Sequence, residues 1–418
     1  MAAESLRVLV HASELLTGEG IRNKDGRLIE EHDVGQIADA ALVYSVKRVK
    51  GREIPAKVRW VGRTADLPKK FLKARRTDLK LRRAVIPGLV DAHTHLVFAG
   101  DRSSEFARRC GGATYEEIAR EGGGILRTVT ATRSASEEEL FRLACNRVRE
   151  AQGYGIRTIE LKSGYGLDHD TELKQLRVAR RLKMEFPEVL FQSTYLGAHA
   201  VPKGRSKAEY LDEMLRKTLP EVASRKLADA CDVFIDEGYF TLEEGSRILQ
   251  AAARAGLRIK VHADELSNTA SSELAAGLGA LSADHLLQIS DAGIEALAHS
   301  NTTAVLLPGT AFYLKAAHAP ARRLIERGAR VALASDFNPG TCMTLNLPAV
   351  MTIAALYLGL SRAELFAAVT YNAACALGFQ ERRGTLEAGL DAAFAILPFE
   401  RFEELYYRFA WPSGAKAF

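Results

Sequence analysis

The sequence predicts an α/β protein: a (β/α)8 TIM-like barrel with a small β-sandwich domain built from the two ends of the chain. Three observations indicate this. From residue 84 onward, eight short apolar runs alternate with helix-period stretches, and histidines and carboxylates gather where the runs end. The first 80 residues read instead as short strands broken by Gly and Pro. Eight strand–helix units are the number that closes such a barrel.

The eight expected strands follow one another through the middle of the chain. The last four recur about every 25 residues, which is typical of parallel strands joined by crossover helices. A doubly wound open sheet would need a phosphate-binding glycine fingerprint after its first strand, where this chain has histidines instead. In order, the expected strands are Ala84–Asp91, Ile156–Lys162, Val189–Leu196, Asp229–Ile235, Leu257–Val261, Gly279–Asp284, Thr303–Leu307 and Arg330–Ala334.

Helix-period stretches lie between these strands. Several begin with Ser, Thr or Asp, whose side chains can accept the unpaired N–H groups of a first helical turn. They are Ser136–Gly153, Thr171–Glu185, Leu242–Ala255, Thr269–Leu278, Asp291–His299 and Ala319–Arg327. The tail, Gly384–Phe418, returns to a strand-like pattern. We therefore expect a barrel over residues 84–383 and a small domain made of residues 1–83 and 384–418.

Composition narrows the class of protein. The 418 residues are 47% hydrophobic and 26% charged, which excludes an intrinsically disordered chain. The longest apolar stretch is well short of the ~20 residues that span a bilayer, and the start lacks a signal-peptide pattern. The five cysteines are widely spaced, with no CxxC. We therefore expect a cytoplasmic protein with no disulfide framework and no membrane partner.

Positive charge is concentrated in one segment. The whole chain carries a net charge of +5, yet the residues from Lys47 to Arg83 alone include 15 Lys and Arg against 3 Asp and Glu. Such a run could bind nucleic acid or an anionic surface, or it could be a solvated strand face. No nucleic-acid-binding motif accompanies it. The solvated face is the favoured interpretation, and no nucleic-acid partner is expected.

The chemistry-bearing residues lie at the ends of the expected barrel strands, where barrels of this kind form active sites. His93 and His95 are two apart on an extended chain, so their rings project to the same side. With His262 and Asp336 they make a set of three nitrogens and one oxygen. Such a set leaves a position for water and suits Zn²⁺ or a similar ion. Five of the ten histidines fall at these strand ends: His93, His95, His199, His262 and His285.

At this point a family resemblance is visible. The segment PGLVDAHTH, the histidines of the fifth and sixth strands and the final Ser-Asp resemble the amidohydrolase superfamily. The segments THLVFAGDRSSEF, GGGILRTVTATR, ELKSGYGL, STYLGAHAVP, VHADE, SADHL and SDFNPGTC resemble the imidazolonepropionase family. The resemblance runs from about Val85 to Gly389. It implies a metal-dependent cyclic amidohydrolase that opens the ring of 4-imidazolone-5-propanoate to N-formimino-L-glutamate in histidine degradation.

Carried over position by position, the resemblance also implies residue roles, one Zn²⁺ or Fe³⁺ per subunit, and a homodimer. The implied metal ligands are His93, His95, His262 and Asp336. The implied substrate contacts are Arg102, Tyr165, His199, Glu265, Asn338, Gly340 and Thr341. The implied acid–base and oxyanion-side residues are Glu265 and His285. From its chemistry, Asp336 could also be catalytic, by carrying a proton to the leaving nitrogen while it ligates the metal.

Several roles also follow from the chemistry of the side chains. Glu265 would lie near a water activated by the ion, and Arg102 can grip a propionate tail with two hydrogen bonds. Tyr165, between two glycines, is expected on a flexible loop. The fourth expected strand ends without a lysine that could bridge two metals, so one metal is expected. Lys162 ends the second strand and is interpreted as structural or loop-anchoring.

Two other functions remain open at this stage. A related metal-dependent heterocycle deaminase would use the same ligands and acid–base residues on an exocyclic amine. Arg102 argues against it, because a nucleobase has no carboxylate tail. A barrel that binds a metabolite without turnover is the second alternative, and the intact ligand and acid–base set argues against that.

Overall fold

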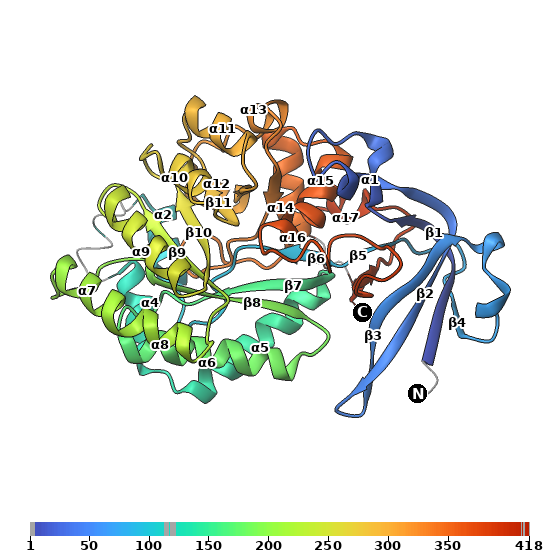
Figure 1. Cartoon of the computed structure of the whole chain (residues 1–418), viewed down its shortest axis with the longest axis horizontal. Helices are drawn as coiled ribbons and strands as arrows, with labels where there is room; N and C mark the ends of the chain where they lie inside the picture. Colours follow the sequence, from blue (N-terminus) through green and yellow to red (C-terminus); the bar gives the residue numbers. More distant parts are fainter. Residues whose placement is uncertain (1–4, 113–116, 118–122, 411, 413, 418) are drawn as a thin grey trace.

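The barrel predicted from the sequence is present in the computed structural model, which describes residues 5–112, 117, 123–410, 412 and 414–417. Eight parallel strands form one sheet in which each strand pairs with its neighbour in sequence (Figure 1). They are β6 (Leu89–Asp91), β7 (Ile156–Lys162), β8 (Leu190–Ala198), β9 (Ala230–Ile235), β10 (Arg258–Ala263), β11 (Ser282–His285), β12 (Thr303–Leu306) and β13 (Val331–Leu333).

The two edges of this sheet meet just beyond β6 and β13. Thr94 forms a parallel bridge with Phe337. The carboxylate of Asp91 accepts hydrogen bonds from the backbone N–H of Ser335 at 2.9 Å and from its hydroxyl at 2.6 Å. These contacts nearly close the barrel, and they lie within a few residues of the candidate ligands His93 and Asp336.

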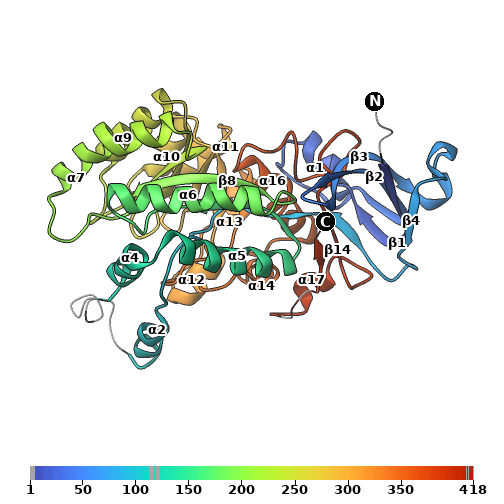
Figure 2. The ribbon, with the colours of Figure 1, turned by 90° about the horizontal axis from the view of Figure 1, so that it is seen from below.

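Helices surround the barrel, and the expected ones are all present. The hydroxyl of Ser136 caps α5 by accepting the N–H of Glu139, and α5 and α6 lie side by side (Figure 2). The barrel helices are α2 (Ser103–Cys110), α4 (Ile125–Ser134), α5 (Glu137–Gly153), α6 (His169–Glu185), α7 (Lys207–Glu213), α8 (Leu219–Ser224), α9 (Leu242–Arg254), α10 (Ser271–Gly277), α11 (Asp291–Ala298), α12 (Pro308–Leu314), α13 (Ala321–Glu326), α14 (Leu347–Ile353), α15 (Arg362–Ala368) and α16 (Tyr371–Cys375). Two π-helical segments, Met214–Thr218 and Ala354–Leu358, follow α7 and α14 directly.

A second sheet of seven strands joins both ends of the chain, as expected for the small domain. Its order is β15-β14-β5-β1-β2-β3, with β4 beside β1. Val8 and Val10 belong to one apolar cluster and Leu9 to another, because side chains alternate across a strand. The elements are β1 (Ser5–Leu16), α1 (Glu19–Asn23), β2 (Gln36–Val49), β3 (Arg52–Arg63), β4 (Arg75–Asp78), β5 (Val85–Pro87), β14 (Phe394–Ile396), α17 (Glu404–Tyr407) and β15 (Lys416–Ala417). The domain boundary at residues 83 and 84 remains a prediction.

The expected first barrel strand, Ala84–Asp91, is wrong as a single strand. The chain changes sheets at Gly88: β5 pairs with β14 and β1 in the small sheet, whereas β6 pairs with β7 in the barrel. The N–H of Gly88 donates to Ala393 and that of Leu89 to Gly155, so adjacent peptides belong to different sheets. A Cβ at residue 88 would lie 2.3 Å from Cγ of Arg157, which explains the glycine.

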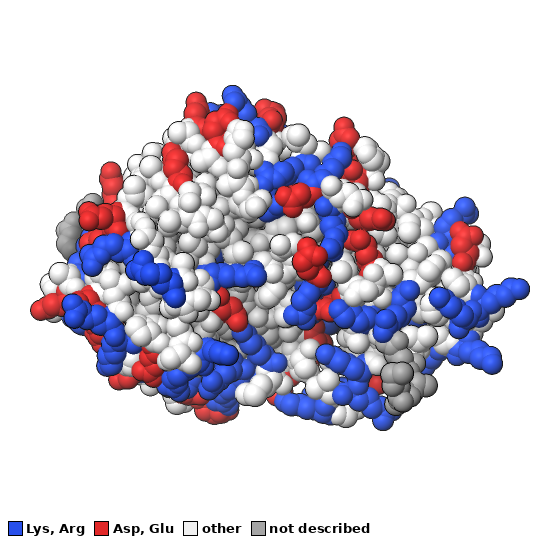
Figure 3. All heavy atoms as spheres, viewed as in Figure 1, with Lys and Arg blue, Asp and Glu red and all other residues white. Residues whose placement is uncertain are grey.

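The basic segment lies on the small sheet. Lys and Arg side chains project from the end of the molecule that β2, β3 and β4 form (Figure 3). Lys57 pairs with Asp391 at 2.9 Å and Lys50 with Glu185 at 3.3 Å. This arrangement agrees with the solvated-face interpretation. Among the helices of the described residues, none is long and apolar enough to cross a membrane.

The loop after α1 attaches the N-terminal segment to the barrel. Gly26 has a φ of 73°, and its carbonyl accepts a 3.0 Å hydrogen bond from Nδ2 of Asn372, which also donates to the carbonyl of Val331 at the start of β13. Arg27 donates to the carbonyls of Ala298 and Gly328 at 2.9 and 2.6 Å. A Cβ at residue 26 would lie 1.8 Å from Oδ1 of Asn372.

We therefore predict that Gly26→Ala lowers the free energy of unfolding more than Gly51→Ala. Both glycines have positive φ, 73° and 77°, but a Cβ at residue 51 meets no atom within 4 Å. Left-handed backbone costs alanine about 1–2 kcal/mol at each site. Displacing buried Asn372 costs about 1–3 kcal/mol more at residue 26 alone. Urea unfolding measures both variants, and equal losses would contradict the proposed attachment.

Candidate metal centre and substrate pocket

The expected site residues converge at the C-terminal ends of the barrel strands. His93 and His95 follow β6, His262 lies in β10, His285 ends β11 and Asp336 follows β13. All five are at most 3% exposed. Parallel strands deliver their C-terminal ends to the same rim of a barrel, so residues far apart in sequence become neighbours here.

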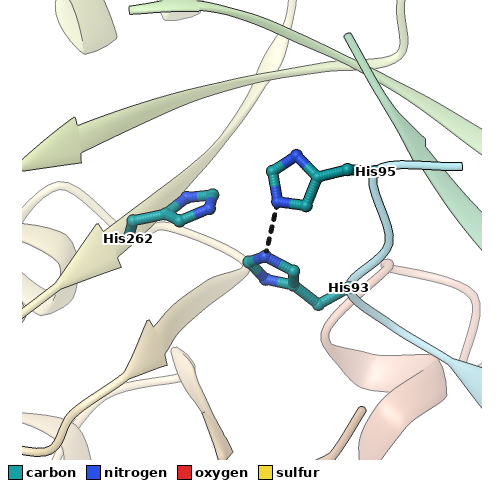
Figure 4. Close-up of side chains that lie close together, drawn as sticks. All are labelled: His93, His95 and His262. Carbon is teal, nitrogen blue, oxygen red and sulfur yellow. Dashed lines mark hydrogen bonds between the residues drawn. The ribbon is translucent and has the colours of Figure 1, made fainter. Parts of the chain in front are cut away.

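Three histidines form a tight cluster at this rim. One ring nitrogen from each of His93, His95 and His262 lies within 4.8 Å of the other two. The Nε2 atoms of His93 and His95 face each other at 3.3 Å, as the spacing of two residues predicts (Figure 4). Oδ1 of Asp336 lies 3.5 Å from each of these two atoms. The Asp336 carboxylate therefore lies beside the His93 and His95 ends of the histidine cluster.

The cluster fits a metal ion. Burial lowers the pKa values of His93 and His95 well below the usual histidine value, so both rings are neutral at pH 7. Nδ1 of His93 lies 2.6 Å from Oδ2 of Asp284, which assigns the ring proton to Nδ1 and a lone pair to Nε2. Nε2 of His262 is buried and has no hydrogen-bond partner among the described residues. Imidazole lone pairs that converge beside a carboxylate suit zinc or iron.

Five fully buried charged side chains fill the barrel beneath the histidines. Nζ of Lys162 lies 2.5 Å from Oδ2 of Asp232 and 3.0 Å from Oε2 of Glu160. Nζ of Lys260 lies 3.0 Å from Oε1 of Glu160 and donates to the carbonyl of Ala92 at 2.8 Å. Because these side chains are buried from bulk solvent, each charge needs an opposite charge nearby. We refer to Glu160, Lys162, Asp232, Lys260 and Asp284 as the ionic floor.

The position of Lys162 bears on the number of metals. It ends β7, where carboxylates of the ionic floor enclose its ammonium group. The fourth barrel strand, β9, ends at Ile235 and is followed by Asp236, so no lysine follows it. These contacts agree with a structural interpretation of Lys162. A single metal remains the prediction.

A cavity of about 350 Å³ opens in front of the cluster. It contains six of the seven expected substrate contacts. The seventh, Gly340, touches the guanidinium of Arg102: a Cβ at residue 340 would lie 2.2 Å from Nη1. The cavity is lined by His95, Arg102, Ile125, Tyr165, His199, Phe234, Tyr239, His262, Glu265, Leu266, His285, Leu314, Asp336, Asn338 and Thr341.

Known proteins are similar to this chain in sequence over most of its length. Residues 99–404 match the model of the amidohydrolase family. The imidazolonepropionase of Porphyromonas gingivalis (strain ATCC 33277) is 45% identical over 400 residues, covering 95% of this chain and 92% of the relative. That of Symbiobacterium thermophilum is 50% identical over 319 residues, 75% of each chain. The chain belongs to the imidazolonepropionase family of amidohydrolases.

Solved structures with the same fold are more distant in sequence. A triazine hydrolase variant superposes with a TM-score of 0.70 at 15% identity, covering 94% of this chain and 86% of that one. The 5-methylcytosine deaminase of Klebsiella pneumoniae superposes with a TM-score of 0.68 at 18% identity, covering 96% and 93%. At such identities the likeness establishes the fold alone.

In this imidazolonepropionase family member, Arg102 is oriented by a residue that the sequence did not reveal. Nε of Arg102 donates to Oε2 of Glu105 at 2.8 Å. Glu105 is 5% exposed and also accepts the backbone N–H of Gly124 at 3.1 Å. Glu105 lies three residues after Arg102 on α2, a spacing at which helical side chains meet. That spacing was the available signal.

Asn338 holds its own loop together. Its Oδ1 accepts the N–H groups of Gly340 and Thr341, both at 2.8 Å. Its Nδ2 donates to the carbonyl of Asp336 at 2.7 Å. The amide thus links the loop residues expected to touch substrate to the expected metal ligand. Its own contact with substrate remains a prediction.

The loop carrying Tyr165 is held more firmly than the flexible loop expected from its glycines. Buried Glu172, on α6, accepts the backbone N–H groups of Gly164, Gly166 and Leu167 at 2.8–3.0 Å. The Tyr165 ring is 4% exposed and lies 5.5 Å from the ring of His199. The loop sequence alone does not reveal that three of its N–H groups bond to one carboxylate, because the acceptor lies in the following helix.

Two further histidines lie beside the cluster: the ring of His285 is 5.2 Å from that of His262, and the ring of His199 is 5.1 Å from that of His95. Nε2 of His285 lies 3.4 Å from Oε2 of Glu265. Burial, together with the nearby carboxylates of Asp336 and Asp236, raises the pKa of Glu265 well above its usual value. Burial lowers the pKa of His199 to about 4, so this ring is neutral at pH 7, and its Nδ1 lies 3.0 Å from the carbonyl of Gly164.

We predict that Lys162→Met lowers the free energy of unfolding by about 3–5 kcal/mol, because it leaves buried carboxylates without a counter-charge. Lys183→Met is the matched control: Lys183 pairs with Asp229 at 2.6 Å, but its side chain is 33% exposed. An exposed pair contributes about 0–1 kcal/mol. Urea unfolding compares the two variants, and similar losses would contradict the buried pairing.

Proposed function

We propose that this chain catalyses the imidazolonepropionase reaction, the hydrolysis of the ring amide of 4-imidazolone-5-propanoate to N-formimino-L-glutamate in histidine degradation. One observation carries the proposal. A single cavity contains a histidine–aspartate cluster suited to a metal and, on its wall, an arginine suited to a carboxylate tail. The names of the curated relatives support the same reaction.

In this proposal, His93, His95, His262 and Asp336 hold one Zn²⁺ or Fe³⁺ per subunit. When bound, the ion supplies Lewis-acid activation of water and of the ring carbonyl. The protein contributes the position of these ligands and a cavity of about 350 Å³ in front of them. All three histidines are buried, and burial keeps His93 and His95 neutral, which is the form that binds metals.

The polar residues around the cluster would then transfer protons and stabilise the negative charge that develops during the reaction. Glu265 accepts a proton from the attacking water, because its carboxylate lies beside the cluster and its raised pKa makes it a stronger base. His285 stabilises the negative charge that develops on the carbonyl oxygen. Asp336 would take the second proton of that water and pass it to the departing ring nitrogen as the C–N bond breaks, and Glu265 would release the first to solvent. One water molecule is consumed: its oxygen becomes part of the new carboxylate and its protons end on the nitrogen and in solvent.

The substrate tail would bind Arg102. Glu105 holds Nε of the guanidinium, and Gly340 leaves room beside Nη1. Tyr165, His199, Asn338 and Thr341 line the same cavity, within reach of the ring. A guanidinium forms two parallel hydrogen bonds with a carboxylate, which an ammonium group does not reproduce.

The direct test is turnover. Metal-loaded protein is incubated with freshly generated imidazolone propionate, and loss of the substrate's ultraviolet absorbance is followed. We expect loss with the loaded protein and none after chelation. No loss with metal bound would overturn the proposal. Release of ammonia from an aminated heterocycle would favour the deaminase, and binding of the substrate without turnover would favour the metabolite-binding barrel.

Replacing Arg102 should raise KM for the propionate substrate. We predict a rise of about 10–100-fold in Arg102→Met, because charged hydrogen bonds of about 1.5–3 kcal/mol are lost, and a smaller rise in Arg102→Lys. Arg108→Met, at an exposed position of α2, the helix that begins just after Arg102, should leave KM unchanged. Steady-state kinetics measures all three variants. An unchanged KM in Arg102→Met would remove the argument for a carboxylate-bearing substrate.

We also propose a homodimer, formed through an apolar groove of about 810 Å³ between α17 and the π-helical segment after α14. Leu356, Tyr357, Tyr407 and Phe409 in this groove are 60–82% exposed. Clustered exposed apolar side chains are typical of subunit contacts, and a two-fold axis lets one patch serve both copies.

A cytoplasmic location remains a prediction from the cysteine pattern.

Tyr407→Glu should therefore convert a dimer into a monomer. Tyr407 is 82% exposed, so the change should not disturb the fold of one subunit. Met184→Glu is the control, since Met184 is 60% exposed but lies on α6, away from the groove. Size-exclusion chromatography with light scattering gives the mass. A wild-type monomer, or a Tyr407→Glu dimer, would contradict this surface.

A further inference from the structure

Two of the three clustered histidines contact carboxylates of the ionic floor through Nδ1. Nδ1 of His93 lies 2.6 Å from Oδ2 of Asp284. Nδ1 of His262 lies 2.9 Å from Oδ2 of Asp232, although the contact is not aligned for a full hydrogen bond. In both cases the carboxylate faces Nδ1, and Nε2 is left on the side of the cluster. The third histidine differs, because Nδ1 of His95 has no hydrogen-bond partner among the described residues.

The two carboxylates are themselves held by lysines. Oδ2 of Asp232 is the atom that lies 2.5 Å from Nζ of Lys162, so one oxygen contacts both the lysine and His262. Oδ2 of Asp284 lies 3.7 Å from Nζ of Lys162 and 3.8 Å from Nζ of Lys260. All four side chains are fully buried. None of them lines the substrate cavity.

The strand register explains this arrangement. Lys260 and His262 are two apart in β10, so both project into the barrel. Lys260 is paired in the sheet with Asp232 of β9, and His262 with Asp284 of β11. This register places a lysine and two aspartates on the strands around the ligand histidine. The ionic floor is therefore built into the same strands that carry the site.

We propose that Asp232 and Asp284 are positioning residues of the metal centre, each holding one ligand histidine by Nδ1 so that Nε2 points at the ion, with Lys162 and Lys260 fixing the two carboxylates. The inference rests on the proposed ligand set of His93, His95, His262 and Asp336. It adds a function for charges that otherwise only fill the barrel. A carboxylate behind a metal-bound imidazole fixes the ring and its tautomer, and its loss typically costs 10–100-fold in metal affinity.

The test is metal binding, not activity. Asp232→Asn and Asp284→Asn each keep the size of the side chain but weaken the acceptor for Nδ1. We expect the affinity for Zn²⁺, measured by competition with a chromogenic chelator, to fall by about 10–100-fold in each. We also expect the visible absorption of the Co²⁺-loaded protein to shift, because the ligand geometry changes. The two variants act on different histidines, so one remains informative if the other fails to fold.

Asp236→Asn is the matched control. Asp236 lies just beyond β9, the strand that carries Asp232, and is buried. It accepts from the Ser267 hydroxyl and from backbone N–H groups, those of Glu237, Leu266 and Ser267, and none of these residues is a proposed metal ligand. It should lower stability while leaving Zn²⁺ affinity and the Co²⁺ spectrum as in the wild type. If Asp232→Asn and Asp284→Asn behave like Asp236→Asn, the ionic floor is merely structural and the inference is overturned.

The His262→Ala variant tests the proposed ligand set separately from the positioning inference that rests on it. If the proposed ligands are right, this variant loses Zn²⁺ affinity whatever the aspartates do. Loss in His262→Ala without loss in the two aspartate variants overturns the positioning inference alone. Full affinity in His262→Ala overturns the ligand set and, with it, the inference built on it.

Discussion

The structure depends on the pairing of opposite charges among the side chains buried inside the barrel. Two ammonium groups and three carboxylates are buried together, and each lies 2.5–3.8 Å from at least one group of opposite charge, which makes its burial tolerable. Breaking such pairs costs several kcal/mol, whereas an apolar core of the same volume would carry no such risk. The carboxylates that balance the lysines also face the histidines above them. The charges therefore connect the stability of the barrel to the geometry of its rim.

The rim is supported in the same way on its other sides. Asp91 and Ser335 join the barrel edges beneath His93 and Asp336, and Glu172 gathers three N–H groups of the Tyr165 loop. In each case a buried carboxylate satisfies several donors and so holds irregular backbone at one position. A pocket that holds a metal and a carboxylate-bearing substrate at fixed positions relative to each other needs this rigidity. Glu105 extends the pattern to Arg102.

Local sequence patterns predicted the barrel strands, the helices between them and the histidine cluster. Buried parallel strands are apolar runs separated by capped helices, so all eight barrel strands were found, and histidines at their ends marked the cluster. The break at Gly88 was missed because VIP and LVD are equally apolar, and their sheets are chosen by Phe394 and Ile156, distant in sequence. The ionic floor was missed for a similar reason: Asp232 and Lys260 are unusual inside apolar strands, but their partners depend on register. Whether Asn338 or Glu172 holds a loop depends on backbone geometry that composition does not contain.

Anomalous X-ray scattering from crystals of the metal-loaded protein tests the account most directly. At the absorption edge of the bound metal we predict one peak per subunit, within bonding distance of Nε2 of His93, His95 and His262 and of an oxygen of Asp336. Nδ1 of His93 and of His262 should face Asp284 and Asp232 in the same map. Two peaks, a peak bound by Lys162, or ligation through Nδ1 would contradict the account.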